Sequence, residues 1–277
     1  KKNKLFKLRK EFITYNIDGY IVPKNDEFFG EYVDERNDRL YYISSFSGSA
    51  GYALILKKKS YLFVDGRYTL QAKKESDKNF KIIEIHRSKP SKILLKIHKK
   101  LKIGFDPKLF SEANLISNFK TKNTSLIPIK QNLIDKIWLN RPKATIKEFF
   151  VLNSKYTGKN YRNKLNLVSK ILKKRKINKL LITAPENLAW LLNIRGKDSK
   201  YSPLPNCHAI LDDKKKITLI VNKNKINNKF KLHFKNILKY INPLYIAKYF
   251  DSLNRNEFFL IDKFSCSFFY KKLISKK

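Results

Sequence analysis

Apolar residues recur at helical spacing in the first segment of the chain and then form a short continuous run. The spacing places four of them on one helical face while Lys, Arg and Glu occupy the rest: Leu5, Leu8, Phe12 and Tyr15. Asp18-Gly19 interrupts this pattern, and the apolar run 20–22 is stopped by Pro23. The pattern predicts an amphipathic helix followed by a short buried strand.

Helical and strand patterns then alternate through the first half of the chain. We expect helices near 39–46, 70–75, 90–100 and 111–120, and strands at 52–56, 61–64, 80–85, 102–105 and 125–129. Strands 52–56 and 61–64 are separated by a short polar turn, so they are expected to pair as a hairpin. This alternation is typical of a mixed α/β sheet.

The same order of elements returns after residue 141. The second set comprises a helix at 161–172, a strand at 179–183, a helix at 185–194, a loop at 195–205, strands at 207–211 and 217–221, and a further strand at 257–263. An internal repeat of this kind indicates two α/β domains of related topology, each with a mixed sheet flanked by helices. We expect domains at 1–141 and 158–277, joined by a linker at 142–157.

Charge is the most unusual feature of the composition. The 277 residues carry 61 Lys and Arg against 23 Asp and Glu, a formal net charge of +38. Only ten of the basic residues are Arg, the residue that makes two-pronged contacts to phosphate and guanine. The Lys runs are also scattered, which favours a solvated surface and predicts nucleic-acid binding that is non-specific and sensitive to salt. The 42% hydrophobic content excludes an intrinsically disordered chain.

Location and redox state follow from what the sequence lacks. No run approaches the roughly 20 apolar residues of a membrane span, and the first ten residues lack the apolar core of a signal peptide. We therefore expect a soluble cytoplasmic protein with no membrane partner. Cys207 and Cys266 are expected to be reduced and structural. Position 1 is not Met, so we expect a processed chain or a fragment.

Patterns that carry chemistry are scarce. The four histidines, His86, His98, His208 and His233, lack the spacing of a zinc site, and no Gly-x-Ser-x-Gly or Walker loop is present. The Gly pair in 48–51 precedes a strand, so we interpret it as a tight turn and not as a phosphate cradle. The sequence therefore predicts no catalytic residue and no metal ligand in this chain.

Several ordered strings nevertheless resemble one family. Asp34-Glu35-Arg36, the run 43–51 (ISSFSGSAG) and the run 64–72 (VDGRYTLQA) resemble the N-terminal domain of Xaa-Pro aminopeptidases of the creatinase and prolidase superfamily. The run 132–138 (NLIDKIW) with Arg141-Pro142 looks like the end of that domain. Tyr156-Thr157-Gly158 and the run 188–198 (LAWLLNIRGKD) resemble motifs of a second domain in the three-domain form. The run 204–207 (LPNC) departs from the family pattern.

The resemblance implies two tandem creatinase N-terminal-like domains with a ribonuclease H-like fold. It further implies a C-terminal "pita-bread" catalytic domain with two divalent metals, usually manganese, held by two Asp, one His and two Glu. Such an enzyme removes the N-terminal residue before proline from peptides, and is expected to be a homodimer when full length. We expect this catalytic domain to be missing from the 277 residues, so that the chain alone is inactive and holds no cofactor.

Three residues are substrate-cleft candidates under this resemblance: Arg67, Tyr68 and Arg195. A guanidinium at a strand end can hold a peptide carboxylate or carbonyl in two-pronged fashion. The alternatives are an ion pair of Arg67 with Asp65 or a nearby acid, and hydrogen bonds from Arg195 that hold the following loop. Trp138 and Trp190 are expected in a core or between domains.

Two other functions remain open at this point. The chain could be a non-catalytic interaction module on the same fold, although +38 charges disfavour basic partners. It could also be a basic nucleic-acid-binding protein, which is supported by charge alone. Fold does not decide among such functions.

Overall fold

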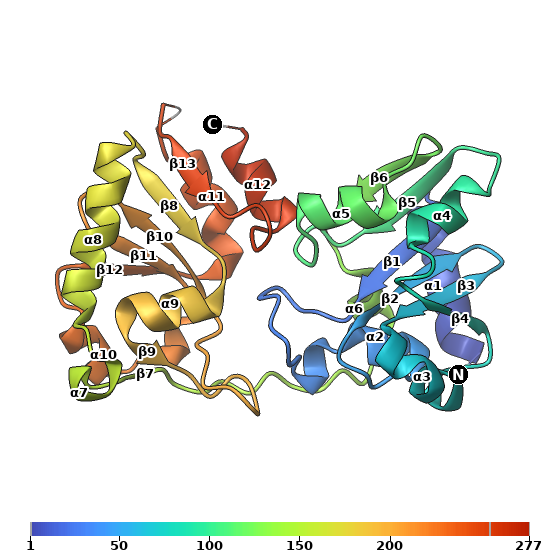
Figure 1. Ribbon diagram of the computed structural model, residues 1–277, viewed down its shortest axis with the longest axis horizontal. Helices are drawn as coiled ribbons and strands as arrows, with labels where there is room; N and C mark the ends of the chain where they lie inside the picture. The colour runs from blue at the N-terminus through green and yellow to red at the C-terminus, as the bar shows by residue number, and fades with distance from the viewer. Residues whose placement is uncertain (1, 255, 277) are drawn as a thin grey trace. The chain divides into compact units, whose positions relative to one another are not determined.

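The chain forms two compact units, which we describe separately. The computed structural model describes residues 2–254 and 256–276. The first unit consists of Lys1–Glu27 and Glu35–Lys143, and the second consists of Phe28–Asp34 and Ala144–Lys277 (Figure 1).

A six-stranded mixed sheet is the centre of the first unit. Its strand order is β4-β3-β2-β1-β5-β6, with β1 at Gly19–Pro23, β2 at Gly51–Leu56, β3 at Ser60–Val64, β4 at Phe80–Glu84, β5 at Leu101–Phe105 and β6 at Thr124–Pro128. β2 pairs antiparallel with both β1 and β3, whereas the pairs β3–β4, β1–β5 and β5–β6 are parallel. The predicted hairpin is therefore confirmed, with Gly51 opposite Val64.

Short helices cover this sheet. They are α1 (Lys2–Thr14), α2 (Arg39–Ser44), α3 (Thr69–Glu75), α4 (Pro90–Leu95), α5 (Glu112–Phe119) and α6 (Leu133–Ile137), with 3₁₀ turns η1 (Glu35–Asn37) and η2 (Gly66–Tyr68). The predicted apolar face of α1 is buried through Leu5, Leu8 and Phe12 and joins α2, α6 and the sheet in one core. Asn132 caps α6 by accepting hydrogen bonds from the backbone N–H groups of the first turn.

The second unit repeats the arrangement of the first. Its sheet has the order β12-β11-β10-β8-β13, with β8 at Lys179–Ile182, β10 at His208–Asp212, β11 at Ile217–Ile220, β12 at Leu238–Ile241 and β13 at Phe259–Ile261. Going from β12 to β13, the pairings are parallel, antiparallel, antiparallel and parallel. The strands β4-β3-β2-β1-β5 show the same sequence of pairings. The related topology predicted from the repeat is confirmed, and β6 is an addition of the first unit.

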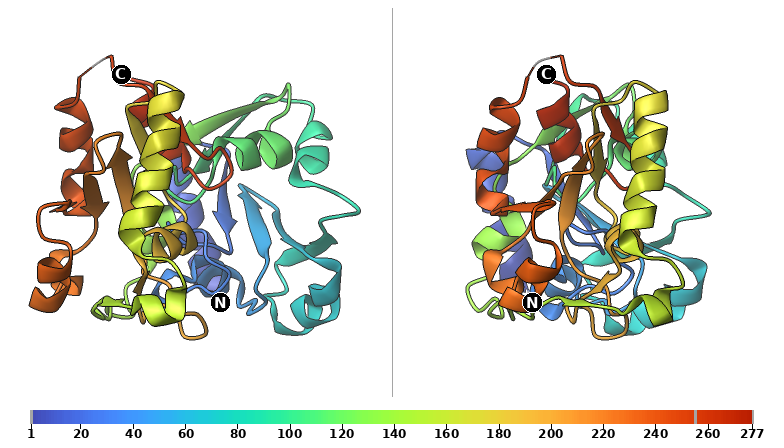
Figure 2. Two further views of the ribbon diagram at one scale, coloured as in Figure 1. Left: turned by 60° about the vertical axis from the view of Figure 1, so that its left-hand side comes forward. Right: turned by 90° about the vertical axis from the view of Figure 1, so that its left-hand side faces the viewer.

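Both faces of the second sheet are covered. The helices are α7 (Ser154–Thr157), α8 (Tyr161–Lys174), α9 (Pro185–Leu192), α10 (Asn228–His233), α11 (Ile246–Asp251) and α12 (Phe268–Ile274), with 3₁₀ turns η3 (Lys223–Lys225) and η4 (Pro243–Tyr245). Successive residues of β8 point to opposite faces of the sheet. Ile182 belongs to the hydrophobic core between the sheet and helices α8 to α10, and Leu181 belongs to the core between the sheet and helices α11 and α12. Figure 2 shows α8 on one side of this sheet and α11 and α12 on the other.

The expected linker at 142–157 differs from the structure. The division between the units falls between Lys143 and Ala144. Phe149 is fully buried in the core of the second unit, and the short strand β7 (Phe150–Val151) pairs antiparallel with β9 (Ile194–Arg195). Residues 149–152 therefore belong to the second unit, because Phe149 is buried in its core and the backbone of this segment is hydrogen-bonded there.

The described part of the chain contains no helix that is both long and apolar enough to cross a membrane.

Candidate functional site

Arg67 lies directly beyond the end of β3, as the sequence predicts. Asp65 caps the η2 turn by accepting a hydrogen bond from the Arg67 backbone N–H, and its Oδ1 also accepts one from Arg67 Nε at 3.0 Å. The Arg67 side chain remains 74% exposed. The hydrogen bonds from the Arg67 backbone and side chain lower the pKa of Asp65. The ion pair within the unit is thus present, and the guanidinium still faces solvent.

Tyr68 joins this turn to the Gly48 loop, the segment 46–51. Its hydroxyl lies 2.8 Å from Ser49 Oγ, and its ring meets Phe46 edge-on at 5.8 Å. Gly48 has no positive φ, but a Cβ there would lie 2.2 Å from the Phe46 ring. Close packing against this ring, and not a left-handed turn, therefore requires glycine at position 48.

Polar side chains from α3 complete the same surface. Glu75 accepts hydrogen bonds from the Ser47 backbone and hydroxyl, at 2.9 and 3.0 Å, and from Gln71. Desolvation acts to raise the pKa of Glu75, but these hydrogen bonds outweigh it and lower the pKa. The Gly48 loop is therefore held in place from two sides, by Tyr68 and by Glu75. Sequence reasoning did not find Glu75, whose partner is 28 positions away.

A buried ionic cluster lies elsewhere in the first unit. Arg39 is 2% exposed and donates to both oxygens of Asp135, at 2.8 and 3.0 Å, and to Glu27 at 3.1 Å. Arg141 also pairs with Asp135, at 2.6 Å. Desolvation acts to lower the pKa of Arg39, but Glu27 and Asp135 raise it well above its ordinary value. The cluster joins α2, α6 and the segment after α6, which is a structural role.

Arg195 does not hold the loop that follows it. Its guanidinium donates to the backbone carbonyls of Ala189 and Ile194, at 2.9 and 2.8 Å. The expectation that hydrogen bonds from Arg195 hold the following loop was therefore wrong. The side chain instead holds the C-terminal end of α9. A guanidinium turned onto its own backbone has fewer donors left for a ligand.

The loop 196–205 is held instead by Asp198. One of its carboxylate oxygens accepts from the Asn206 backbone N–H at 2.8 Å, and the other pairs with Lys225 at 2.6 Å. The Asp198 side chain is only 6% exposed. A Cβ on Gly196 would lie 2.7 Å from the carbonyl oxygen of Leu204, so the two ends of the loop are too close for any larger residue. Asp198 lies in the motif 188–198, but the sequence does not reveal Lys225 as its partner.

The two tryptophans have different environments. Trp138 stacks on Tyr42 with ring centroids 4.4 Å apart and packs against the core of the first unit, as expected. Trp190 was expected in a core or between domains; it does not lie in a core, since it is 52% exposed, with Lys164 Nζ 4.8 Å from its ring centroid. The inward face of α9 is already filled by Leu188, Leu191 and Leu192, so the ring at position 190 points away from that core.

The cysteines and histidines form no metal site among the described residues. Cys207 and Cys266 are free thiols and buried, and desolvation raises both pKa values, that of Cys266 to about 12. Such thiols are unreactive at neutral pH. No group of three or more His, Cys, Asp or Glu side chains in residues 2–254 and 256–276 could hold a metal ion. These residues do not fit the two metals that the resemblance implies.

Family models match nearly the whole chain. Two models described as "Creatinase/Prolidase N-terminal domain" match residues 4–137 and 140–277. Their boundary lies close to the division between the two structural units.

Curated relatives agree with this assignment. The chain is 33% identical over 229 residues to a probable Xaa-Pro aminopeptidase P of Coprinopsis cinerea, covering 80% of this chain and 37% of the relative. It is 34% identical over 243 residues to Xaa-Pro aminopeptidase 1 of Dictyostelium discoideum, covering 82% of this chain and 39% of the relative. The chain thus spans somewhat more than a third of the length of these relatives.

A solved structure has the same fold. The X-prolyl aminopeptidase of Caenorhabditis elegans, described as a cytosolic enzyme with a di-nuclear active site, matches with a TM-score of 0.81 and 25% identity. The match covers 89% of this chain and 43% of the solved one.

Proposed function

The chain belongs to the creatinase/prolidase family, with two tandem N-terminal domains of the Xaa-Pro aminopeptidase type, and from this premise we propose that it forms the substrate-cleft and assembly region of such an enzyme. The observation that carries the proposal is that the matches to Xaa-Pro aminopeptidases extend over both domains, covering 80% of this chain for one curated relative and 89% for one solved structure. The enzyme would act on peptides with proline in second position and release the residue before it.

The proposal assigns the hydrolytic chemistry to a catalytic domain outside these 277 residues. Two divalent metals, with manganese the expected ion, would supply a hydroxide nucleophile and polarise the scissile carbonyl there. Within this chain, the described residues offer no ligand cluster for them. The 277-residue chain alone is therefore proposed to be inactive.

The candidate contribution of this chain is to position substrate. Arg67 has the exposed guanidinium and the strand-end location that a contact beyond its own unit requires. Tyr68 orients the Gly48 loop beside it through Ser49. Arg195 is the second cleft candidate: its Nη1 donates to the carbonyls of Ala189 and Ile194, and a peptide would be bound through the rest of the guanidinium.

Assembly and location are part of the same proposal. We propose a homodimer of the full-length enzyme and a cytoplasmic location, the latter because the C. elegans neighbour is described as cytosolic. A non-catalytic interaction module and a nucleic-acid-binding protein remain the alternatives, and neither gains a specific supporting contact among the described residues.

The reading frame downstream of Lys277 provides the test. The proposal expects that frame to encode two Asp, one His and two Glu that converge as ligands, and the extended polypeptide to hydrolyse Xaa-Pro peptides when manganese is added. An extended polypeptide that folds and binds metal but does not cleave such peptides would favour the interaction-module alternative.

A further inference from the structure

A pocket in the second unit lies at the carboxyl ends of two parallel strands. It has a volume of about 200 Å³, and its walls come from α8, from β8 with Thr183 directly beyond it, from α9 and from the turn after β13. We call it the β8 pocket. None of the three substrate-cleft candidates lines it. The argument for this pocket goes beyond the proposed function and does not depend on it.

The two strands at this pocket send the chain to opposite faces of the sheet. β8 and β13 are parallel neighbours, with Ile261 opposite Leu181. β8 leads into α9, which shares a core with Ile182, whereas β13 leads into α12, which shares a core with Leu181. Figure 1 shows both strands pointing the same way, with α9 beginning where β8 ends. Ligands of open α/β sheets bind in the crevice that such a change of face leaves at the carboxyl ends of strands.

Three polar side chains at the pocket are linked by hydrogen bonds. Asp262 accepts from the Phe264 backbone N–H at 3.0 Å and from the Ser265 hydroxyl, and these bonds outweigh desolvation and lower the pKa of Asp262. An ionised carboxylate can only accept, so Ser265 donates its hydroxyl proton to it. Ser265 Oγ therefore accepts from Thr183 Oγ, 2.9 Å away. The linked groups present oxygen acceptors to the pocket and have no hydroxyl proton left to donate.

Asp262 is not neutralised by a cation of its own. Among residues 2–254 and 256–276, no Lys or Arg forms an ion pair with this exposed carboxylate. Lys263 acts on it only at longer range, and its Nζ lies 5.0 Å from the centroid of the Phe264 ring. In a chain with 61 basic and 23 acidic residues, a carboxylate without a basic partner at a crevice is available to a cationic ligand.

Charges on the neighbouring helices leave this end of the pocket negative. Lys164 of α8 donates to the Trp190 carbonyl and to Asn193 Oδ1, at 2.8 and 2.6 Å, so its charge lies at the C-terminal end of α9. Thr183 lies at the other end, roughly 12 Å away along a helix of eight residues. Glu186 in the first turn of α9 offsets the positive end of the helix dipole there.

Apolar side chains form the remaining wall of the β8 pocket. Val168, Leu180 and Leu191 line it from three different elements. At about 30 Å³ for each non-hydrogen atom, as in liquid water, the space holds a ligand of roughly seven such atoms. The pocket therefore suits a short aliphatic chain with a polar group at one end.

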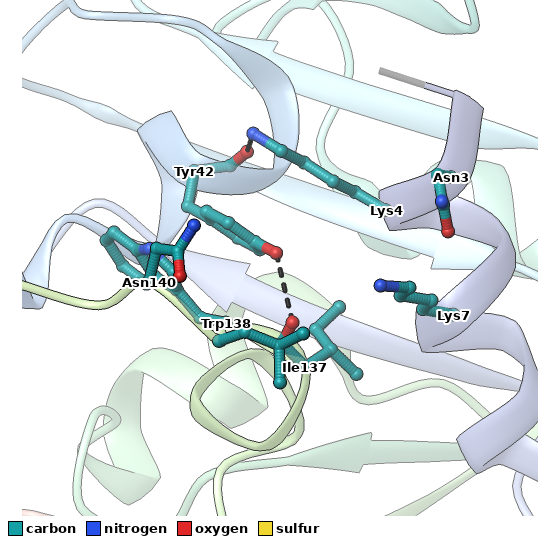
Figure 3. A pocket seen from close by; sticks show the side chains of 8 residues that line it. Asn3, Lys4, Lys7, Tyr42, Ile137, Trp138 and Asn140 are labelled. Atoms are coloured by element: carbon teal, nitrogen blue, oxygen red, sulfur yellow. Dashed lines mark hydrogen bonds between the residues drawn. The ribbon is translucent and has the colours of Figure 1, made fainter.

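A hollow in the first unit offers no comparable space. It lies between α1, Tyr42 and the segment 137–140 (Figure 3). Both faces of the Tyr42 ring are covered, by Trp138 stacked at 4.4 Å and by Lys4 Nζ 4.2 Å from the ring centroid. A ligand would find no open ring surface there.

We propose that the β8 pocket binds a small alkylammonium cation. The ammonium group would donate to a carboxylate oxygen of Asp262 and to Thr183 Oγ, while the alkyl chain packs on the apolar wall. An ammonium group has three donors and no acceptor, which matches linked side chains that can only accept. Its hydrogen bond to the carboxylate is charge-assisted and is the strongest polar contact available in the pocket. An anion of the same size would instead face the Asp262 carboxylate.

Trp190 lines the pocket and provides a reporter. In a Trp138→Phe background it is the sole tryptophan, because the chain has two. The 277-residue chain is titrated with n-butylammonium, n-butanol and butyrate at constant ionic strength while Trp190 fluorescence is followed. We expect n-butylammonium to saturate with a Kd of about 1 mM. The alcohol and the carboxylate should bind at least about tenfold more weakly, because neither supplies a charged donor.

Matched variants decide whether this pocket is responsible. Asp262→Asn keeps an oxygen for the Phe264 N–H but removes the charge, and it should weaken n-butylammonium binding about tenfold. Asp213→Asn removes the same charge just beyond Asp212, which pairs with Lys179 at the opposite end of β8, and should leave the Kd unchanged. Val168→Phe fills the pocket with a larger side chain while Asp262 stays intact, and should abolish binding.

Each outcome bears on the β8 pocket alone, since no peptidase activity is measured. The proposal is overturned if n-butylammonium does not saturate, if n-butanol binds as tightly, or if Asp262→Asn and Asp213→Asn behave alike. Should Asp262→Asn fail to fold, Val168→Phe decides, and an unchanged Kd in that variant would also overturn the proposal.

Discussion

The guanidinium of Arg39 holds both carboxylate oxygens of Asp135, at 2.8 and 3.0 Å, across 96 positions of sequence. Arg39 begins α2 and Asp135 lies in α6, so this pair joins two helices that pack on the same core. A buried cation stripped of water depends on such partners.

Removal of Asp135 should therefore destabilise the first unit. Asp135→Ala leaves Arg39 buried with one carboxylate fewer, and we expect the free energy of unfolding to fall by about 3 kcal/mol. Urea denaturation of a Trp190→Phe background, in which Trp138 is the sole tryptophan, measures the change by fluorescence. Arg87→Ala removes the exposed pair with Glu84, in which Arg87 is 82% exposed, and should change little. Equal effects of the two substitutions would contradict a special role for the buried pair.

The loop 196–205 should open when its charged anchor is lost. Lys225→Met leaves the buried Asp198 carboxylate without its ion pair, so the loop should unfold locally more often. We expect trypsin to cleave after Lys200 about tenfold faster, because a loss of one charged contact shifts the opening equilibrium by that order. Lys223→Met, which removes a neighbouring exposed charge, serves as the control. Unchanged cleavage in Lys225→Met would mean that Asn206 alone fixes the loop.

His233 should titrate below the ordinary histidine range. Desolvation and the nearby Arg162 charge lower its pKa, so the native state favours the neutral ring. The unfolded chain then binds more protons, and this contribution to stability is present above the ordinary value of about 6.5 and lost as pH falls below it. An NMR titration of the four histidines measures the pKa directly, and His233→Gln should reduce the loss of stability between pH 7 and 5. A His233 pKa at or above 6.5 would contradict the assignment.

Arg67 should matter for turnover and not for folding. Its pair with Asp65 is exposed, and exposed pairs contribute little to stability. In the full-length enzyme, Arg67→Ala is expected to lower kcat/KM for Xaa-Pro peptides about tenfold, the effect of losing one charged contact, with Tm nearly unchanged. Arg87→Ala is the matched exposed control. A clear drop in Tm with intact activity would instead assign Arg67 to the internal ion pair.

Local patterns predicted the fold better than they predicted the partners of polar residues. The strands at 52–56 and 61–64 are continuous apolar runs, and the structure buries them as β2 and β3. β12, which we did not predict, is an edge strand whose two central residues, Lys239 and Tyr240, are exposed, so it lacks an apolar run. Edge strands need only one pairing partner and little burial.

Long-range polar contacts left no local signal. Asp198 and Lys225 are 27 positions apart, and nothing in either segment indicates the other. For Arg195 the local sequence left two kinds of partner open. A guanidinium at a strand end can donate hydrogen bonds either to a ligand or to the backbone carbonyls at the end of a neighbouring helix. Only the folded backbone decides between those partners.

Peptidase activity of the purified 277-residue chain tests the central claim most directly. The chain is assayed with a proline-containing peptide and excess manganese, and calorimetry records any metal binding. A two-metal hydrolase needs ligands that hold the ions about 3.5 to 4 Å apart, and no described cluster offers them. We predict no cleavage and no stoichiometric binding of two ions. Metal-dependent cleavage, or tight binding of two ions, would show that the chain itself contains the active site.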